Sequence, residues 1–439
     1  MEAANAIGHA FAALLSERKI PLVVAVGRDN RPHGKSLRDA LVEGLVASGA
    51  DVVDIGVVPT PLLYWSLHHL PVHAGIQITG SHNPPEFNGF KLCAGTASVY
   101  GQQIQRLRAI VESGAYPKGK GSVRSEAVIE RYEADIAARI GKLSRPLKVV
   151  IDCGNGAGAL VAPTLFPRLG ITPRFLYAES DGTFPNHHPD PTVVENLRDL
   201  IATVRREGAD LGIGFDGDAD RIGIVDRHGT IIWGDYLLIL YARDVLARAA
   251  KGTPPQSVIF DVKCSQALPA AIQAAGGVPV MWKTGHSLIK EKMKELHAPL
   301  AGEMSGHMFF TEGFYGHDDA LYGAARLLRI VADSGKGVDE LLADIPRYVS
   351  TPEIRVDCPD DRKFAIVAAA VAHFKRTRDV VEVDGARVLY GDGWGLVRAS
   401  NTQPILVVRF EALTQARLDA IRKDMADWLA TQGVSFPGG

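Results

Sequence analysis

A short acidic run, DGDADR, gives the strongest chemical signal in the sequence. Its carboxylates, Asp216, Asp218 and Asp220, are separated by small residues, so three hard oxygen ligands can converge on one cation without crowding. The same spacing opens an EF-hand loop, but that loop requires Gly at its sixth position and Glu at its twelfth, where this chain has Arg221 and Arg227. Three carboxylates with coordination positions left for phosphate oxygens suit Mg²⁺. We therefore predict a metal site here; the alternative is an acidic turn in solvent.

A polar segment around Ser81 has the composition of a phosphoryl carrier. The sequence TGSHNPPEFNGFK spans residues 79–91, and its small first residues leave the Ser81 hydroxyl exposed among the donors His82, Asn83, Asn88 and Lys91. A Ser-His-Asp hydrolase is a weaker interpretation, because there is no G-x-S-x-G elbow and adjacent serine and histidine residues point apart on a strand. A serine that carries a phosphoryl group needs a cation opposite it, which the acidic run provides. A polar turn is the alternative.

Two further segments have groups suited to a phosphorylated sugar. In GEMSGH (302–307), Glu303, Ser305 and His307 alternate, so they face one side if the segment stays extended, and such a mixture suits sugar hydroxyls. RASNTQP (398–404) combines guanidinium and hydroxyl groups, which suit a phosphate dianion. Its polar members are Arg398, Ser400, Asn401 and Thr402, with Arg409 on the next predicted strand. The alternatives are a polar loop and a hairpin turn. Two more candidate residues end predicted strands, Lys263 and His286.

Two glycine-containing segments imitate nucleotide-binding motifs. GNGAGA (154–159) follows a predicted strand and fits G-x-G-x-x-G/A, with Glu179 and Asp181 about 20 residues further on. A tight strand-to-helix turn is favoured over a dinucleotide site, because a lone motif of this kind is often a false positive. The run GKS (34–36) imitates the end of a Walker A loop, but Asp29 stands where that loop has its first glycine, and a carboxylate there would repel a phosphate.

The candidate residues follow strands in a layout that occurs three times. In each stretch, β-branched runs alternate with helical segments, the arrangement of a parallel sheet covered by helices. The third run of each stretch leads into a loop rich in Gly, Ser, His or Asp. The predicted strands are 22–29, 51–58 and 74–82; then 148–154, 173–178 and 211–226; and then 257–265, 278–286 and 298–310.

The C-terminal part of the sequence has a different pattern. Its predicted strands are separated by short turns, which favours an antiparallel sheet, and a helix over residues 415–429 would cover one face. These strands are 351–358, 386–390, 393–400 and 404–412. Candidate domain boundaries are the Gly/Pro/Ser stretch 113–125, a junction near residue 230 and the segment 345–352.

Composition excludes several classes of protein. The chain has 439 residues, and 48 Lys plus Arg against 50 Asp plus Glu give a net charge of −2, which argues against general binding to nucleic acid or anionic membranes. No apolar run approaches the roughly 18 residues of a membrane span. The cysteines lack metal or disulfide spacing, so we expect them to be reduced. These observations predict a soluble cytoplasmic protein that binds neither nucleic acid nor membrane.

Five motifs in a fixed order carry a resemblance to a known family. The set TGSHNP, FNGFK, DGDADR, GEMSGH and RASNTQP resembles the α-D-phosphohexomutase superfamily, and is most similar to bacterial phosphomannomutase/phosphoglucomutase. The resemblance extends from about Val23 to Glu411 and includes VGRDNR, NHHPDP and WKTGHSLIKEKM. It implies an α/β protein with three related mixed-sheet units plus a C-terminal α+β domain around a central cleft. The implied domains are 1–127 with the phosphoserine, 128–230 with the metal, 231–346 for sugar recognition and 347–439 for the phosphate clamp.

The resemblance also implies roles for the candidate residues. Ser81 resembles the serine that is phosphorylated, and the three aspartates of DGDADR look like Mg²⁺ ligands together with it. The sugar readers would be Glu303, Ser305 and His307, and the phosphate clamp Arg398, Ser400, Asn401 and Thr402, with Arg409. Residues with catalytic or charge-stabilising roles would be His82, Lys91, Arg221, Lys263 and His286. The implied reaction interconverts mannose or glucose 1-phosphate and 6-phosphate through a 1,6-bisphosphate, with glucose 1,6-bisphosphate or its mannose equivalent as activator, in a monomer.

One departure from the family pattern concerns the beginning of the sequence. Family members begin with a strand resembling A-Y-D-I-R-G, and nothing of that form precedes Phe11. We therefore expect the first domain to lack this strand and its cation, which leaves an inactive phosphosugar-binding protein as one alternative. A second alternative is a phosphoglucosamine-type mutase, although Met304 within GEMSGH is the form associated with glucose and mannose phosphates.

Overall fold

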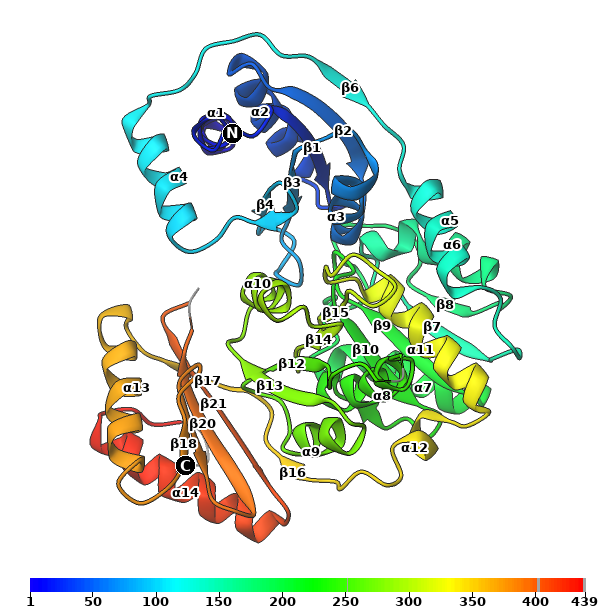
Figure 1. The fold of residues 1–439 in the computed structure, drawn as a ribbon, viewed down its shortest axis with the longest axis vertical. Helices are drawn as coiled ribbons and strands as arrows, with labels where there is room; N and C mark the ends of the chain where they lie inside the picture. Colours follow the sequence, from blue (N-terminus) through cyan, green and yellow to red (C-terminus); the bar gives the residue numbers. More distant parts are fainter. Residues whose placement is uncertain (251, 401–402, 437–439) are drawn as a thin grey trace. The chain divides into compact units, whose positions relative to one another are not determined.

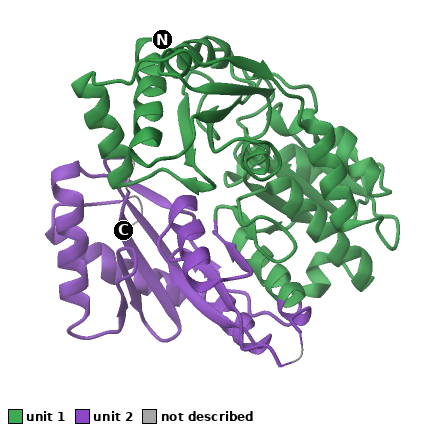
Figure 2. Cartoon of the chain, turned by 45° about the horizontal axis from the view of Figure 1, so that its top comes forward, with its two compact units in different colours: residues 1–245, 305–342 green, residues 246–304, 343–439 purple. Residues whose placement is uncertain are grey.

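The computed structural model describes residues 1–250, 252–400 and 403–436, and it divides into two compact units. Unit 1 comprises Met1–Val245 and Ser305–Leu342, and unit 2 comprises Leu246–Met304 and Ala343–Gly439 (Figure 2). The chain thus leaves unit 1, enters unit 2 and returns before its C-terminal part completes unit 2. No helix in the described ranges combines the length and apolar character that a membrane crossing requires.

The first sheet of unit 1 carries the serine segment. Its order is β5-β4-β3-β1-β2-β6, in which β1 pairs in parallel with β2 and β3, whereas β4 runs antiparallel to β3. The strands are β1 (Val23–Arg28), β2 (Asp51–Val57), β3 (Ala74–Thr79), β4 (Gly89–Ala94), β5 (Ala97–Ser98) and β6 (Val123–Ser125). The helices are α1 (Glu2–Glu17), α2 (Gly34–Ala47), α3 (Thr60–His69) and α4 (Gln102–Ser113), as Figure 1 shows. The three predicted strands are confirmed, whereas β4 lies where a loop was predicted.

The second sheet of unit 1 carries the acidic run. Its order is β11-β10-β9-β7-β8, and the acidic run forms the turn of the antiparallel hairpin β9–β10. The strands are β7 (Val149–Asp152), β8 (Arg174–Leu176), β9 (Leu211–Phe215), β10 (Ile222–Asp226) and β11 (Ile231–Ile232). The helices before α8 are α5 (Ile129–Ile140), η1 (Ala157–Leu160), α6 (Ala162–Arg168), η2 (Val194–Leu197) and α7 (Arg198–Glu207). The remaining elements with residues in unit 1 are α8 (Gly234–Ala247), β15 (Met308–Phe310), α11 (Ala320–Ser334) and α12 (Val338–Leu341).

Unit 2 contains a parallel arrangement followed by an antiparallel one. Strand β12 (Ser257–Asp261) pairs in parallel with β13 (Val278–Trp282) and β14 (Leu300–Gly302), and the accompanying helices are α9 (Ala267–Ala274) and α10 (His286–Leu296). The C-terminal sheet pairs only antiparallel strands, as predicted. They are β16 (Val349–Ser350), β17 (Ile354–Asp357), β18 (Val380–Val381), β19 (Ala386–Leu389), β20 (Gly393–Ala399) and β21 (Ile405–Ala412). Its helices are α14 (Gln415–Thr431), which was predicted, and α13 (Asp360–Phe374), which was not.

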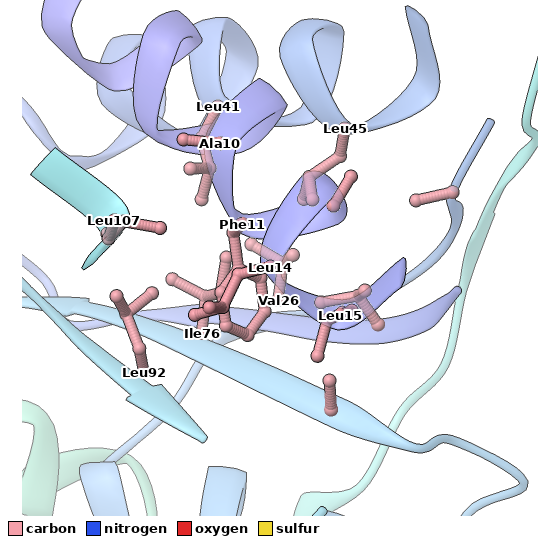
Figure 3. Packing of buried hydrophobic residues seen from close by; sticks show 14 of the residues in the cluster. Ala10, Phe11, Leu14, Leu15, Val26, Leu41, Leu45, Ile76, Leu92 and Leu107 are labelled. Carbon is pink, nitrogen blue, oxygen red and sulfur yellow. The ribbon is translucent and has the colours of Figure 1, made fainter. Parts of the chain in front are cut away.

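The core of unit 1 begins with its N-terminal helix. Phe11, Leu14 and Leu15 of α1 are buried against Val26 and Ile76 of the sheet and against Leu41, Leu45, Leu92 and Leu107 (Figure 3). Helices α1 and α2 meet through two glycines, because a Cβ on Gly8 would overlap the carbonyl oxygen of Leu41 and one on Gly44 would overlap that of Asn5. The four cysteines, Cys93, Cys153, Cys264 and Cys358, are buried, and no disulfide joins them, as expected.

Gly44→Ala is predicted to destabilise unit 1, because its methyl group forces α1 away from α2. The cost should be about 1–3 kcal/mol, the usual range for overpacking. Gly323→Ala in α11 is the matched control, since the nearest atom to its Cβ is 3.6 Å away and alanine is the better helix former. Thermal unfolding checks this: equal midpoints for the two variants would contradict the close helix contact.

Candidate active site

The acidic run lies inside the protein rather than in solvent. Asp216, Asp218 and Asp220 are all 0% exposed, and carboxylate oxygens from the three lie within 4.8 Å of one another. Burial, with repulsion from Asp220 and Asp218, raises the pKa of Asp216 far above its usual value. The solvated acidic turn considered as an alternative is therefore wrong. Carboxylates this close and this buried need a cation to remain charged.

The structure provides both a protein cation and open oxygen atoms at this cluster. The Lys91 ammonium on β4 donates to Asp218 Oδ2 at 2.8 Å and also to Asp220 Oδ2. Burial alone would lower the pKa of Lys91, but the two carboxylates more than offset this and raise it. Among the described residues, Asp218 Oδ1 and Asp220 Oδ1 are buried and accept no hydrogen bond. Such hard oxygen donors fit Mg²⁺.

The Ser81 hydroxyl points at this cluster. Its Oγ donates to Asp216 Oδ2 at 2.9 Å, so the serine and the predicted metal ligands form one site. Ser81 follows β3 in a turn with φ of +47°, outside the strand, and its Oγ therefore lies 3.3 Å from His82 Nδ1. The expectation that these two side chains point apart was wrong, because it assumed strand geometry. Burial lowers the pKa of His82 to about 4, so its imidazole is neutral at pH 7.

Glycines allow three backbones to meet beneath the site. A Cβ on Gly217 would overlap the carbonyl oxygen of Ser81, and one on Gly156 would lie 2.7 Å from the carbonyl oxygen of Gly217. That carbonyl accepts from the N–H of Ala157 at 2.8 Å. The GNGAGA turn therefore packs against the backbone of the acidic run and donates a hydrogen bond to it. Its second glycine, which in a dinucleotide motif admits a pyrophosphate, here admits the backbone of Gly217, so the tight-turn interpretation is the right one.

A chain of polar contacts runs from Arg221 to a carboxylate that the sequence analysis did not select. Arg221 Nε donates to His307 Nε2 at 2.9 Å, so Nδ1 carries the ring proton in neutral His307. That Nδ1 lies 3.4 Å from Asp318 Oδ2 and 3.7 Å from Asp220 Oδ1. Asp318 is fully buried. It is one of the polar residues between β15 and α11, and the strand-end pattern used for the other candidates would have identified it.

Two threonines also contact the acidic cluster and were not predicted. Thr60 Oγ1 donates to Asp218 Oδ2 at 2.5 Å, and Thr79 Oγ1 lies 3.0 Å from the same oxygen and 2.8 Å from Asp29 Oδ2. Asp29 is buried. Because Thr79 Oγ1 contacts both Asp29 and Asp218, the Asp29 carboxylate is linked to the acidic cluster. In the sequence, Asp29 indicated only that GKS is not the end of a Walker A loop.

The segment GEMSGH does not stay extended. Residues 304–305 form a turn, in which the N–H of Met304 donates to Asp261 Oδ1 at 3.0 Å. The common face expected for Glu303, Ser305 and His307 is therefore not formed. Glu303 is buried and accepts from the N–H of Gly285 at 2.6 Å, next to His286 at the start of α10.

In unit 2, Lys263 is held by carboxylates. Its ammonium pairs with Glu353 Oε1 at 2.5 Å and lies 3.7 Å from Asp261 Oδ2. Burial works to raise the pKa of Glu353, but Lys263 more than offsets this and lowers it to about 2. Arg409, which was predicted beside the phosphate clamp, is buried, and its guanidinium donates to the carbonyl of Lys263.

Two predicted clamp residues lie near the turn after β20. Arg398 Nε donates to Asp384 Oδ2 at 2.9 Å, and the Ser400 hydroxyl accepts from the N–H of Gln403 at 3.1 Å. Both residues are buried. The predicted residues Asn401 and Thr402 lie outside the described residues.

Family models and relatives match nearly the whole chain. The phosphoglucomutase/phosphomannomutase models match residues 1–118 (α/β/α domain I), 130–229 (domain II), 233–348 (domain III) and 353–428 (C-terminal domain). A Pseudomonas aeruginosa protein named phosphomannomutase/phosphoglucomutase is 47% identical over 437 residues, which cover 99% of this chain and 93% of that protein. A Neisseria gonorrhoeae phosphoglucomutase is 45% identical, with 96% and 91% covered.

A solved structure agrees with these relatives. A phosphoglucomutase/phosphomannomutase family protein from Burkholderia thailandensis has a TM-score of 0.91 and 42% identity, over 99% of this chain and 95% of that chain. Fold and site thus define a phosphotransferase of the α-D-phosphohexomutase superfamily. Within it, the chain belongs to the phosphoglucomutase/phosphomannomutase family. The resemblance and the fold class inferred from the sequence are confirmed.

We expect Mg²⁺ to stabilise the protein through the acidic run. At a concentration about 100 times its Kd, a ligand adds about 2.7 kcal/mol to the free energy of unfolding. Asp218→Asn should abolish the Mg²⁺-induced rise in the unfolding midpoint and the heat of binding in titration calorimetry. Asp226→Asn is the control, because Asp226 is equally buried but caps the β10–β11 turn. An unchanged response in the Asp218 variant would exclude this site.

The Lys263–Glu353 pair should make unit 2 sensitive to acid. The pKa of Glu353 is lower in the folded protein than its usual value of 4.5, so its contribution is complete above that pH and is lost as pH falls toward 2. Glu353→Gln should therefore be less stable than the unsubstituted protein at pH 7, by about 3 kcal/mol at most. Urea unfolding should show this difference shrinking between pH 4.5 and pH 2. Glu382→Gln, which removes an exposed partner of Lys375, is the control. A difference that is independent of pH would contradict the pairing.

Proposed function

We propose that this protein interconverts the 1-phosphates and 6-phosphates of mannose and glucose through phosphorylated Ser81. The observation that carries the proposal is the 2.9 Å hydrogen bond from Ser81 Oγ to Asp216, within a cluster of three buried aspartates. Relatives named phosphomannomutase/phosphoglucomutase support the substrate class. We also propose that it acts as a cytoplasmic monomer.

The acidic run would hold Mg²⁺ through Asp216, Asp218 and Asp220, with Ser81 beside it. Bound Mg²⁺ supplies charge stabilisation to phosphoryl oxygens during transfer. Phosphoserine brings about −1.5 to −2 charges next to buried carboxylates, so the protein must also supply positive charge. Lys91 and Arg221 are the cations at this site. They would stabilise the negative charge on the transferred group in both directions of the reaction.

Two phosphoryl transfers make up the proposed reaction. In the first, the bond from phosphorus to Ser81 Oγ breaks and a bond forms from phosphorus to a sugar hydroxyl oxygen; that hydroxyl loses its proton, Ser81 Oγ gains one, and a 1,6-bisphosphate results. In the second, the bisphosphate presents its other phosphate: the bond from that phosphorus to its sugar oxygen breaks, a bond forms to Ser81 Oγ, the sugar oxygen is protonated to a hydroxyl, and Ser81 loses its hydroxyl proton. Neutral His82, with Nδ1 3.3 Å from Oγ, is a base within reach of that proton. A trace of glucose or mannose 1,6-bisphosphate would activate molecules that start unphosphorylated.

Residues outside the acidic cluster would bind the sugar and its second phosphate. We propose that Glu303, Ser305 and His307 bind the sugar and that His286 has an acid–base or charge-stabilising role, with Lys263 as a further cation. For the phosphate we propose Arg398, Ser400, Asn401 and Thr402, with Arg409. Arg398 already contacts a carboxylate, Asp384, at 2.9 Å, so a phosphate dianion would compete for a guanidinium that is oriented toward an anion.

Ser81→Ala should abolish both phosphorylation and turnover. We expect a loss of at least about 1000-fold in kcat, because alanine has no hydroxyl group to carry the phosphoryl group and the remaining residues of the site cannot replace it. The assay couples formation of glucose 6-phosphate or mannose 6-phosphate from the 1-phosphate to a dehydrogenase, with Mg²⁺ and trace glucose 1,6-bisphosphate. Intact mass should show one added phosphoryl group in the unsubstituted protein and none in the variant. Ser98→Ala, from β5 of the same sheet, is the control and should keep full activity.

Two further measurements separate the alternatives. A higher kcat/KM for glucosamine 1-phosphate than for either hexose 1-phosphate would favour the phosphoglucosamine-type mutase. Calorimetric binding of a hexose phosphate without turnover would favour an inactive phosphosugar-binding protein. Full activity in Ser81→Ala would exclude the carrier role of Ser81.

A further inference from the structure

One buried arginine binds the loop that contains Ser81 at four separate points. Arg31 is 1% exposed and follows β1 in the sequence VGRDNR. Its Nη2 donates to the carbonyl oxygens of Ser81 at 2.7 Å and Asn83 at 2.6 Å. Its Nη1 donates to the carbonyl oxygen of Phe87 at 3.1 Å and to that of Pro84. The guanidinium therefore contacts only backbone atoms of this loop.

The loop depends on these contacts because it has little regular structure. Residues 81–88 contain no helix or strand, so no regular hydrogen-bond ladder fixes the carbonyl groups of this segment, and Arg31 supplies hydrogen bonds to four of them. The loop residue before Ser81 also accommodates the guanidinium: a Cβ on Gly80 would lie 2.5 Å from Arg31 Cζ. Glycine at this position thus allows the arginine to lie directly against the loop backbone.

Asp29 fixes the arginine and joins it to the end of β3. Its Oδ2 accepts from Arg31 Nε at 3.0 Å and from the N–H of Gly80 at 3.2 Å, and its Oδ1 accepts from the N–H of Arg31 at 3.1 Å. The Phe184 ring lies 5.2 Å from the guanidinium carbon. Arg31 is thus held by a carboxylate and an aromatic ring, and it holds the loop.

Ser81 itself has a backbone conformation that needs support. Its φ of +47° lies in the left-handed region, which costs free energy for a residue other than glycine unless neighbouring contacts enforce it. The hydrogen bond from Arg31 to the Ser81 carbonyl acts on this same residue. The Oγ of this same residue donates to Asp216 Oδ2 at 2.9 Å.

We propose that Arg31 is a positioning residue for phosphoryl transfer: by binding four carbonyl oxygens of the Ser81 loop, it holds the serine in the orientation that faces the acidic cluster. The inference rests on the proposed function and deepens it. Arg31 contacts no carboxylate of the acidic run and no hydroxyl of Ser81, so it acts through the loop. A lysine cannot replace it, because a single ammonium lacks the planar fork that reaches four acceptors. Displacement of a reacting atom by about 1 Å can cost about 100-fold in rate.

The test compares Arg31→Lys with Arg326→Lys. Arg326 is the matched control, because it is equally buried in unit 1 but pairs with Asp244 and Glu312. Arg31→Lys should lower kcat about 10-fold to 100-fold with KM changed less than about 3-fold, and should slow phosphorylation of Ser81 by glucose 1,6-bisphosphate, followed by intact mass. Arg326→Lys should lower the unfolding midpoint while kcat stays within about 2-fold. If Arg31→Lys does not fold, Asp29→Asn, which loosens the arginine, is measured instead.

Hydrogen exchange separates failure of this inference from failure of the proposed function. Peptides that cover residues 80–88 should exchange faster in Arg31→Lys than in the unsubstituted protein, whether or not the protein is a mutase. If the unsubstituted protein has no mutase activity but the Arg31→Lys variant still shows faster exchange, the proposed function is overturned. The role of Arg31 in holding the loop is then retained. Unchanged exchange, or an active Arg31→Lys variant with kcat within about 2-fold, would overturn the inference.

Discussion

Three buried carboxylates in one tight turn are the constraint on which the rest of unit 1 depends. Like charges at this spacing repel strongly where water is excluded, and burial adds the cost of desolvation. The protein meets this cost by directing groups from separate elements to one point: an ammonium from β4, hydroxyls from the start of α3 and the end of β3, and backbone N–H groups of the turn itself. The sheets of unit 1 therefore place partners around the negative charge of the three carboxylates. A bound divalent cation would complete the neutralisation of that charge.

The positions of the polar residues follow from the direction of parallel strands. Ser81 follows β3, the GNGAGA turn follows β7 and the acidic run follows β9, and each of these strands pairs in parallel with a neighbour. In unit 2, Lys263 follows β12 and Glu303 follows β14, which also pair in parallel. Carboxyl ends of parallel strands lie at one edge of a sheet, so residues that follow strands of the same sheet are brought together there, as the GNGAGA turn and the acidic run are. Glycine at 156 and 217 then lets backbones approach more closely than side chains would permit.

Local sequence predicted the parts of the site that depend on local spacing. The acidic run, the Ser81 segment and most of the strands were identified because the information lies within a few residues. The turn in GEMSGH was not, because a hydrogen bond to Asp261, some 40 residues earlier, forms part of it. The hydrogen bond from Arg409 to the carbonyl of Lys263 could not be predicted for a related reason: a strand sequence does not reveal which backbone carbonyl a buried guanidinium contacts. The GNGAGA motif was ambiguous because a glycine admits a ligand and another backbone equally well.

The course of the chain has a consequence for how such a protein can diverge. Ser81, Lys91, Arg221 and the acidic run belong to unit 1, whereas Lys263, Glu303 and Arg398 belong to unit 2, which the chain enters after residue 245 and leaves again before residue 305. The proposed transfer chemistry and much of the proposed sugar recognition are therefore encoded in different stretches of the gene. Selection can alter the second stretch, and with it the preferred sugar, while the first is inherited unchanged.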